Sequence, residues 1–104
     1  MHQLTVQKLK EWKDSNTDYQ LIDIREEHEV DDLSMGGEHI PMGEIMGKLD
    51  RISKTKPVVI HCRIGSRSTA VCNALYVAGF DNIYDLQGGI SEWVRSIEPS
   101  LAKK

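Results

Sequence analysis

Apolar residues recur at helical spacing near the start of the chain. Val6, Leu9 and Trp12 fall on one face of a helix, with lysines on the opposite face. Thr5 precedes them and has a side chain suited to an N-cap. The next apolar segment, residues 19–25 (YQLIDIR), is short, rich in β-forming residues and ends in charge. The pattern therefore predicts a helix that begins after Thr5, followed by a strand.

The middle of the chain is less regular. Residues 26–45 mix acids, glycines and a proline without a sustained period, which predicts a loop containing a short helical turn and a short strand. Ile45, Leu49 and Ile52 then follow one another at i, i+4 and i+7. This spacing predicts a second amphipathic helix over residues 42–53.

The second half of the chain alternates between strand and helix patterns. Residues 58–62 (VVIHC) form a continuous β-branched, apolar run after Pro57, as expected for a strand buried on both faces of a parallel sheet. A helix is expected to follow from residue 66 to Gly79, then a strand over 82–86 and a last helix over 90–97. The inward residues expected for these two helices are Val71, Ala74, Leu75 and Ala78, and Ile90, Trp93, Val94 and Ile97. This alternation predicts an α/β domain with a central, mostly parallel sheet and helices on both faces.

Composition narrows the classes of protein that need to be considered. The 104 residues suit one domain over 1–104, and 39% hydrophobic and 28% charged residues are ordinary for a globular protein. The net charge of -3 gives no general attraction to nucleic acid or to an anionic membrane. The first residues lack a signal-peptide pattern and no apolar run could span a bilayer, so a cytoplasmic location is expected. Two cysteines without C-x-x-C spacing predict neither a metal site nor a disulfide scaffold.

Cys62 stands where a strand is expected to end and a helix to begin. Cationic surroundings or a helix N-terminus favour the reactive thiolate over the thiol. The loop from Arg63 to Ser66 can turn its backbone N–H groups towards whatever the sulfur carries, and Gly65 widens its conformational choice. Arg63 and Arg67 add positive charge suited to oxyanions. The pattern favours a reactive cysteine in a local anion site over a buried core thiol.

The histidines do not indicate a Cys/His hydrolase. His61 precedes Cys62, but adjacent residues of a strand point to opposite faces, so His61 is expected to be a core or supporting residue. His28 and His39 lie in the irregular segment and are expected to be exposed polar residues.

The position of the second arginine bears on the cargo. Cysteine-dependent phosphatases use a C-x5-R loop, which would require an arginine where this chain has Ser68. Arg67 comes one residue earlier, so the loop is shorter. A single sulfur atom, held as a persulfide, suits this loop better than a tetrahedral phosphate. Phosphatase or arsenate reductase activity is kept as a less favoured alternative.

Three segments of the chain resemble the single-domain type of rhodanese-like sulfurtransferases. Residues 62–67 (CRIGSR) match the active loop C-R-x-G-x-R of that family. Residues 21–29 (LIDIREEHE) resemble its D-V-R-x-x-x-E segment. Residues 82–93 (NIYDLQGGISEW) resemble its closing signature, L-x-G-G followed by W. The segment GGEHIPMGEI at 36–45 departs from the family's G-H-I-P-G-A after Pro41. The resemblance extends from about Leu21 to Trp93 and implies a single rhodanese-like domain.

The resemblance also implies an activity. Cys62 would take a sulfane sulfur from a small anionic donor, thiosulfate or a related persulfide, and pass it to a thiol or cyanide acceptor. Arg63 and Arg67 would bind the donor. The backbone amides expected to stabilise the persulfide are those of Ile64, Gly65, Ser66 and Arg67. No cofactor is implied.

Supporting roles follow from the same resemblance. Asp23 and Arg25 occupy the D-x-R positions and would brace the loop or extend the anion site, with a structural ion pair favoured for Asp23. Cys72 lies among apolar helix residues and is expected to pack in the core. Gly88 and Gly89 are expected to serve turn geometry. An alternative function is that of a persulfide carrier or interaction module that exchanges sulfur with a sulfur-relay protein partner.

Overall fold

The computed structural model describes residues 2–102 and contains a five-stranded parallel sheet. The strands are β1 (His2–Leu4), β2 (Gln20–Asp23), β3 (Glu38–His39), β4 (Val58–His61) and β5 (Ile83–Leu86). The helices are α1 (Val6–Asp14), α2 (Glu27–Asp32), α3 (Met42–Ile45), α4 (Ser66–Val77) and α5 (Gly89–Ser96), with 3-10 turns η1 (Leu49–Arg51) and η2 (Pro99–Ala102). The strand order is β1-β5-β4-β2-β3, and every pair is parallel.

The central strand is β4, as its unbroken apolar sequence predicts. All four of its residues are buried, and it pairs with β2 on one side and β5 on the other. In the register with β2, Asp23 lies opposite His61, so both strands end at the same edge of the sheet. The residues after them, including Cys62, therefore meet at that edge.

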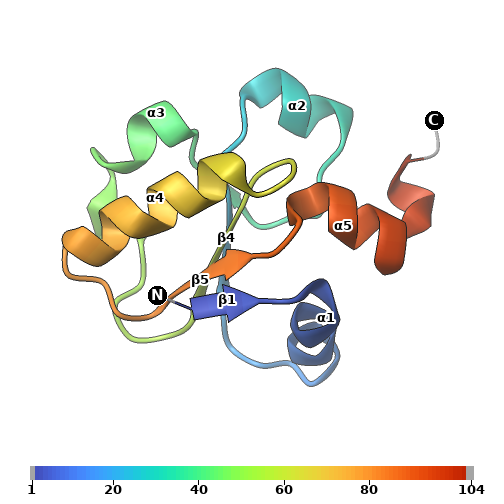
Figure 1. Ribbon diagram of the computed structural model, residues 1–104, viewed down its shortest axis with the longest axis horizontal. Helices are drawn as coiled ribbons and strands as arrows, with labels where there is room; N and C mark the ends of the chain where they lie inside the picture. Colours follow the sequence, from blue (N-terminus) through green and yellow to red (C-terminus); the bar gives the residue numbers. More distant parts are fainter. Residues whose placement is uncertain (1, 103–104) are drawn as a thin grey trace.

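Helices cover both faces of the sheet, as expected. In Figure 1, α3 and α4 lie on one side of the strands and α1 on the other. One core cluster joins Ile60 of β4 to Ile45 of α3 and Leu75 of α4. The other joins Val59 to Leu9 of α1 and Trp93 of α5. Successive β4 side chains thus supply the two cores, which is the alternation that a doubly covered sheet requires.

Several predicted elements are confirmed. Thr5 caps α1, its side chain accepting a hydrogen bond from the Lys8 N–H. The irregular segment 26–45 contains the expected short helix and short strand, α2 and β3. α4 stops at Val77, one residue before Ala78, and Gly79 follows with a φ of +104°. Ala78 is exposed, so its expected inward position is wrong.

The helix predicted over residues 42–53 is wrong as a continuous element. It consists of the four-residue α3 and the separate turn η1. Gly43 and Gly47 lie within this segment and weaken a helix because they have no side chain and much backbone freedom. Ile45 and Ile52 are nevertheless buried, so the apolar spacing identified the residues that reach the core.

β1 was not predicted at all. It has three residues and, among the strands of residues 2–102, pairs with β5 alone, which lies far along the chain. A strand this short has too few positions for a period to be visible in its sequence. None of the helices in the described part of the chain has the length and apolar character needed to cross a membrane.

Candidate active site

Cys62 directly follows β4 and sits beneath the loop that leads into α4. Cys62 is 0% exposed and forms part of the core cluster under α4. Polar backbone groups nevertheless also contact the sulfur. The Gly65 N–H lies 3.2 Å from Sγ and the Ser68 N–H lies 3.3 Å from it, both as donors. Two backbone dipoles therefore point at the sulfur, where they favour negative charge.

The cradle differs in part from the predicted one. Of the four amides expected around the sulfur, Gly65 is the one whose N–H reaches Sγ among residues 2–102, and Ser68 joins it. Gly65 has a φ of +118°, a conformation that other residues rarely adopt, and it is the N-cap of α4. Ser68 is the third residue of α4, where a backbone N–H has no partner within the helix. This general property of helix starts was the signal that could have identified Ser68.

The start of α5 forms hydrogen bonds with the backbone of the loop. The Ile90 N–H donates to the Cys62 carbonyl at 2.9 Å, and the Ser91 N–H donates to the Arg63 carbonyl at 3.0 Å. A Cβ atom on Gly89 would lie 2.5 Å from the Cys62 carbonyl oxygen and 2.6 Å from that of Arg63. Gly89 is therefore needed for this close approach as well as for its turn, which is more than the sequence predicted.

Arg67 and Arg63 differ in their surroundings. The Arg67 guanidinium forms two parallel bonds with Glu29 of α2, Nη1 to Oε1 at 2.8 Å and Nη2 to Oε2 at 2.9 Å. These bonds lower the pKa of Glu29 from 4.5 to about 2. The side chain of Arg63, by contrast, is exposed and lines a pocket beside the loop. Arg63 is free to meet an incoming anion, whereas an anion that reaches Arg67 must compete with a carboxylate.

Asp23 and Arg25 form a buried ion pair at the end of β2. Arg25 is 3% exposed; its Nη2 lies 2.7 Å from Asp23 Oδ2, and its Nε also donates to that carboxylate. The remaining donors reach the carbonyls of Glu29 and Leu33, so the guanidinium ties β2 to α2. Burial alone would raise the pKa of Asp23, but the Arg25 bonds outweigh it and lower that pKa. These contacts are those of the structural ion pair predicted for Asp23, and they hold β2 against α2 rather than reaching the loop at 62–67 directly. They do not test donor binding by Arg25.

The three histidines considered for a Cys/His site differ in their surroundings. His61 is fully buried, and neither ring nitrogen has a hydrogen-bond partner in the described structure. Burial lowers its pKa from 6.5 to about 4, so the ring is neutral near pH 7. His39 is half-buried and its Nε2 lies 2.6 Å from the Arg25 carbonyl, so its expected exposure is wrong. His28 is exposed, as predicted.

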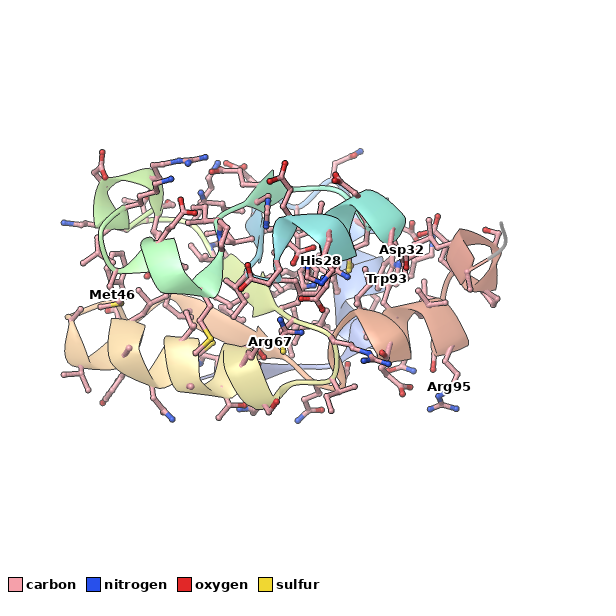
Figure 2. All side chains as sticks on the ribbon, turned by 90° about the horizontal axis from the view of Figure 1, so that it is seen from above. His28, Asp32, Met46, Arg67, Trp93 and Arg95 are labelled. Atoms are coloured by element: carbon pink, nitrogen blue, oxygen red, sulfur yellow. The ribbon has the colours of Figure 1, made fainter. Side chains whose placement is uncertain are left out.

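A pocket of about 530 Å³ opens beside the loop, between α2 and the start of α5. Its lining residues are Arg25, His28, Glu29, Asp32, Leu33, Arg63, Ile90 and Ser91. Figure 2 shows His28 and Asp32 on α2, and Figure 1 shows α2 beside the loop that leads into α4. The pocket carries charges of both signs and lies next to the residues that flank Cys62.

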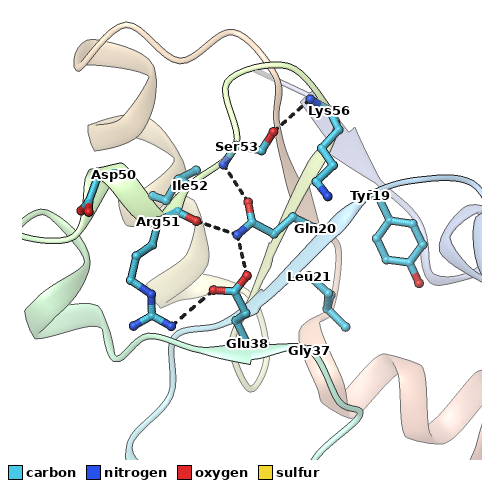
Figure 3. Close-up of a pocket in the computed structure, with 10 residues that line it drawn as sticks. All are labelled: Tyr19, Gln20, Leu21, Gly37, Glu38, Asp50, Arg51, Ile52, Ser53 and Lys56. Atoms are coloured by element: carbon cyan, nitrogen blue, oxygen red, sulfur yellow. Dashed lines mark hydrogen bonds and ion pairs between the residues drawn. The ribbon is translucent and has the colours of Figure 1, made fainter.

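A second pocket, of about 400 Å³, lies at the other end of the sheet, near the start of β2 (Figure 3). Gln20 fills its floor: its Nε2 donates to Glu38 and to the Arg51 carbonyl, and its Oε1 accepts from the Ser53 N–H. These bonds satisfy the Gln20 amide and hold β3 and the segment before β4 against β2. The second pocket thus contains a structural network and lies away from Cys62.

The other cysteine is a core residue. Cys72 is fully buried on α4, and burial, with the nearby negative charge of Asp85, raises its thiol pKa. Its predicted packing role is confirmed. Among residues 2–102 no group of three or more His, Cys, Asp or Glu residues could hold a metal ion.

Comparison with known proteins places this geometry in a family. The model of the rhodanese-like domain matches residues 5–96, nearly the whole chain. The chain belongs to the rhodanese-like family. Its fold agrees with this assignment: a rhodanese-related protein from Thermoplasma volcanium superposes with a TM-score of 0.84 at 28% identity, covering 95% of this chain and 96% of that one.

The rhodanese-like relatives include proteins of similar length and longer ones. The putative sulfurtransferase YtwF of Bacillus subtilis is 34% identical, over 93% of this chain and 94% of its own. A sulfurtransferase of Allochromatium vinosum is 35% identical, over 82% of this chain and 80% of its own. The probable adenylyltransferase/sulfurtransferase MoeZ of Mycobacterium tuberculosis is 29% identical over 94% of this chain, which spans 26% of that longer protein.

Proposed function

We propose that this protein is a sulfurtransferase that carries a sulfane sulfur on Cys62. The observation that carries the proposal is the convergence of the Gly65 and Ser68 N–H groups on Sγ, at 3.2 Å and 3.3 Å. Such donors stabilise a thiolate at Sγ. We propose that they also reach the terminal sulfur of the persulfide, which carries the negative charge once it is bonded to Sγ. Relatives of similar length that are named sulfurtransferases support the same activity.

The proposed reaction has two half-reactions. In the first, the Cys62 thiolate attacks the outer sulfur of thiosulfate, the S–S bond of the donor breaks, and sulfite leaves with the bonding electron pair. In the second, cyanide or a thiolate attacks the terminal sulfur of the Cys62 persulfide. The Cys62 thiolate leaves, and thiocyanate or a new persulfide is released. No external oxidant or reductant is required.

The arginines differ in their proposed roles. Arg63 is exposed beside the pocket and supplies positive charge to an arriving sulfonate. Arg67 contributes to donor binding to the extent that the anion displaces Glu29 from its guanidinium. The size of the cradle supports sulfur over phosphate, because position 68 carries a serine rather than an arginine.

A carrier function is the second candidate. A relative named a putative sulfur carrier protein, YrkF of Bacillus subtilis, is 24% identical over 92% of this chain. The full burial of Cys62 also favours delivery of sulfur within a complex, where a partner protein could guide the donor into the loop. In that case a protein persulfide loads Cys62 faster than thiosulfate does.

Intact-mass measurement after exposure to thiosulfate tests the proposal. The wild-type protein is expected to gain the mass of one sulfur atom and to release thiocyanate when cyanide is added. Cys62→Ser should gain nothing, while Cys72→Ser, the matched control, should gain the same mass as wild type. Absence of both the mass gain and thiocyanate from wild type would contradict the thiosulfate reaction.

Loading by a cysteine desulfurase separates the two candidates. Equal or faster loading by thiosulfate supports the enzyme that uses a small donor. Loading by the desulfurase alone supports the carrier. Hydrolysis of p-nitrophenyl phosphate or reduction of arsenate that depends on Cys62 would contradict both.

A further inference from the structure

Asp85 is a buried acid beneath the start of α4. It belongs to β5, is 3% exposed, and lies on the face of the sheet that α4 covers. A buried carboxylate is costly unless its oxygens accept hydrogen bonds. Neither the composition of the chain nor the three segments that resemble the rhodanese family explains why an acid occupies this position.

Both oxygens of Asp85 accept hydrogen bonds from the first turn of α4. The Ser68 hydroxyl donates to Oδ1 at 2.6 Å, and the Thr69 hydroxyl donates to Oδ2 at 2.7 Å. Both hydroxyl oxygens also lie close to the Gly65 carbonyl, at 3.0 Å and 2.9 Å. A hydroxyl has a single proton, and the shorter distances show that it is directed mainly to the carboxylate. Asp85 therefore fixes the rotation of two side chains and the turn that carries them.

The same turn holds the sulfur. Ser68 donates its hydroxyl proton to Asp85 and its backbone N–H to Cys62 Sγ, so one residue connects the acid to the sulfur. Gly65, the other donor to Sγ, is tied to the same turn because its carbonyl accepts the Thr69 backbone N–H at 3.0 Å. Both N–H groups of the cradle are thus linked to one carboxylate by a single intervening residue.

We propose that Asp85 is a positioning residue that sets the persulfide cradle through Ser68 and Thr69. The Ser68 N–H meets Sγ in the structure, and Asp85 keeps it aimed into the space that this proposal assigns to the charged terminal sulfur of the persulfide. The inference deepens the sulfurtransferase function proposed above and rests on it. The negative charge of Asp85 lies near a site that holds a second negative charge. Under this proposal the geometric effect of the carboxylate on the turn outweighs that repulsion.

The test replaces Asp85 by Asn, which keeps the shape but not the ability to accept from both hydroxyls. The loaded protein is separated from thiosulfate, and decay of the persulfide is followed by intact mass. Asp85→Asn is expected to load with one sulfur atom but to lose it about tenfold faster, the effect expected from losing one well-aligned hydrogen bond to a charged sulfur. Asp81→Asn, the same change at an exposed position of the loop before β5, should decay at the wild-type rate.

A double-mutant cycle checks that Asp85 acts through Ser68. Ser68→Ala should shorten the persulfide lifetime as Asp85→Asn does, and the double variant should be no worse than either, because both changes remove one interaction. Independent, multiplying effects would contradict the proposal. If Asp85→Asn does not fold, Ser68→Ala and Thr69→Val, which each remove one hydroxyl and leave the acid, must still shorten the lifetime. A wild-type lifetime in both would overturn it.

The unloaded protein supplies a readout that does not depend on sulfur transfer. In Asp85→Asn, the NMR signal of the Ser68 amide should move and its hydrogen exchange should accelerate relative to the core amides of β4. An unchanged Ser68 amide would overturn the positioning role even if wild type transfers sulfur. A changed amide in a protein that never loads would instead contradict the function and leave the positioning role supported. A longer-lived persulfide in Asp85→Asn would show that repulsion dominates, and would also overturn it.

Discussion

Arg67 and Glu29 are joined by two hydrogen bonds, at 2.8 Å and 2.9 Å, that connect the loop around Cys62 to α2. The two residues are 38 positions apart in the chain. The carboxylate occupies the face of the guanidinium that a sulfonate or thiosulfate would use, because both kinds of anion present paired oxygens. Under the proposed function, a donor that binds Arg67 therefore has to compete with Glu29.

Removal of this competitor should strengthen donor binding. For Glu29→Gln we expect KM for thiosulfate to fall about two- to fivefold, as expected when a partly exposed ion pair worth about 0.5–1 kcal/mol no longer has to be broken. Steady-state kinetics at constant ionic strength measure this change. Glu27→Gln, on the same helix, is the control and should leave KM unchanged.

The opposite outcome is equally informative. A rise in KM for Glu29→Gln, with unchanged stability, would mean that Glu29 holds Arg67 in the orientation that the donor needs. The competitive role assigned to Glu29 would then be wrong, and the pair would have to be described as part of the donor site.

Arg25 should affect stability rather than donor binding. Arg25→Gln leaves the buried Asp23 carboxylate without its cation, and loss of one partner of a buried ion pair costs about 3 kcal/mol. Urea denaturation should show this loss, while KM for thiosulfate of the folded fraction stays close to that of wild type. Arg63→Gln should do the reverse, with a higher KM and little change in the free energy of unfolding. A raised KM in Arg25→Gln with full stability would place Arg25 in the donor site instead.

The sequence predicted those parts of the fold that depend on local pattern. β4 could be recognised because all of its side chains are buried, and α5 because Ile90 and Trp93 recur at helical spacing. β1 could not, since its position depends on pairing with β5 almost the whole chain away. The broken helix at residues 42–53 shows the converse: the apolar spacing was correct, but glycines ended the regular backbone.

In the candidate site, too, local sequence pattern predicted some features and long-range packing determined others. Cys62, Arg63 and Arg67 were identified because they are adjacent in the sequence and carry obvious chemistry. The bonds that reach this loop from other elements, Glu29 to Arg67 and Asp85 to Ser68, were not predicted, although Glu29 ends the segment at 21–29 that resembles the family. Pairing between distant side chains depends on how those elements pack, which a local pattern does not contain.

His61 should make the protein less stable in mild acid. The ring is buried and its pKa is lowered from 6.5 to about 4 by burial, against a smaller opposing effect of Asp23. As the pH falls from 6.5 towards 4, the unfolded chain takes up the proton before the folded protein does, so the free energy of unfolding decreases. The contribution of neutral His61 to the free energy of unfolding is fully present above pH 6.5, and about 3 kcal/mol of that contribution is lost by pH 4.

A comparison with His61→Leu isolates this effect from the titration of the carboxylates. Urea denaturation of both proteins at several pH values should give curves that diverge below pH 6.5, with the variant losing less stability. At pH 8 the variant should be at least as stable, because it removes two buried nitrogen atoms that have no partner. Parallel stability curves from pH 7 to pH 4 would contradict the low pKa.

Substitution of Gly89 should cost more stability than its positive φ alone predicts. It has a φ of +61°, which by itself costs an alanine about 1 kcal/mol. Its added Cβ would also lie 2.5 Å from the Cys62 carbonyl oxygen, so α5 and the loop would have to separate. Gly36 is the matched control, because its φ of +90° is also positive but no atom lies within 4 Å of an added Cβ.

Gly36→Ala should lose only stability, whereas Gly89→Ala should lose stability and also persulfide formation in the folded protein. The two losses are separated by measuring the mass gain per folded molecule after thiosulfate. Equal loading of the two variants would show that the contact between Gly89 and the Cys62 carbonyl does not position the sulfur.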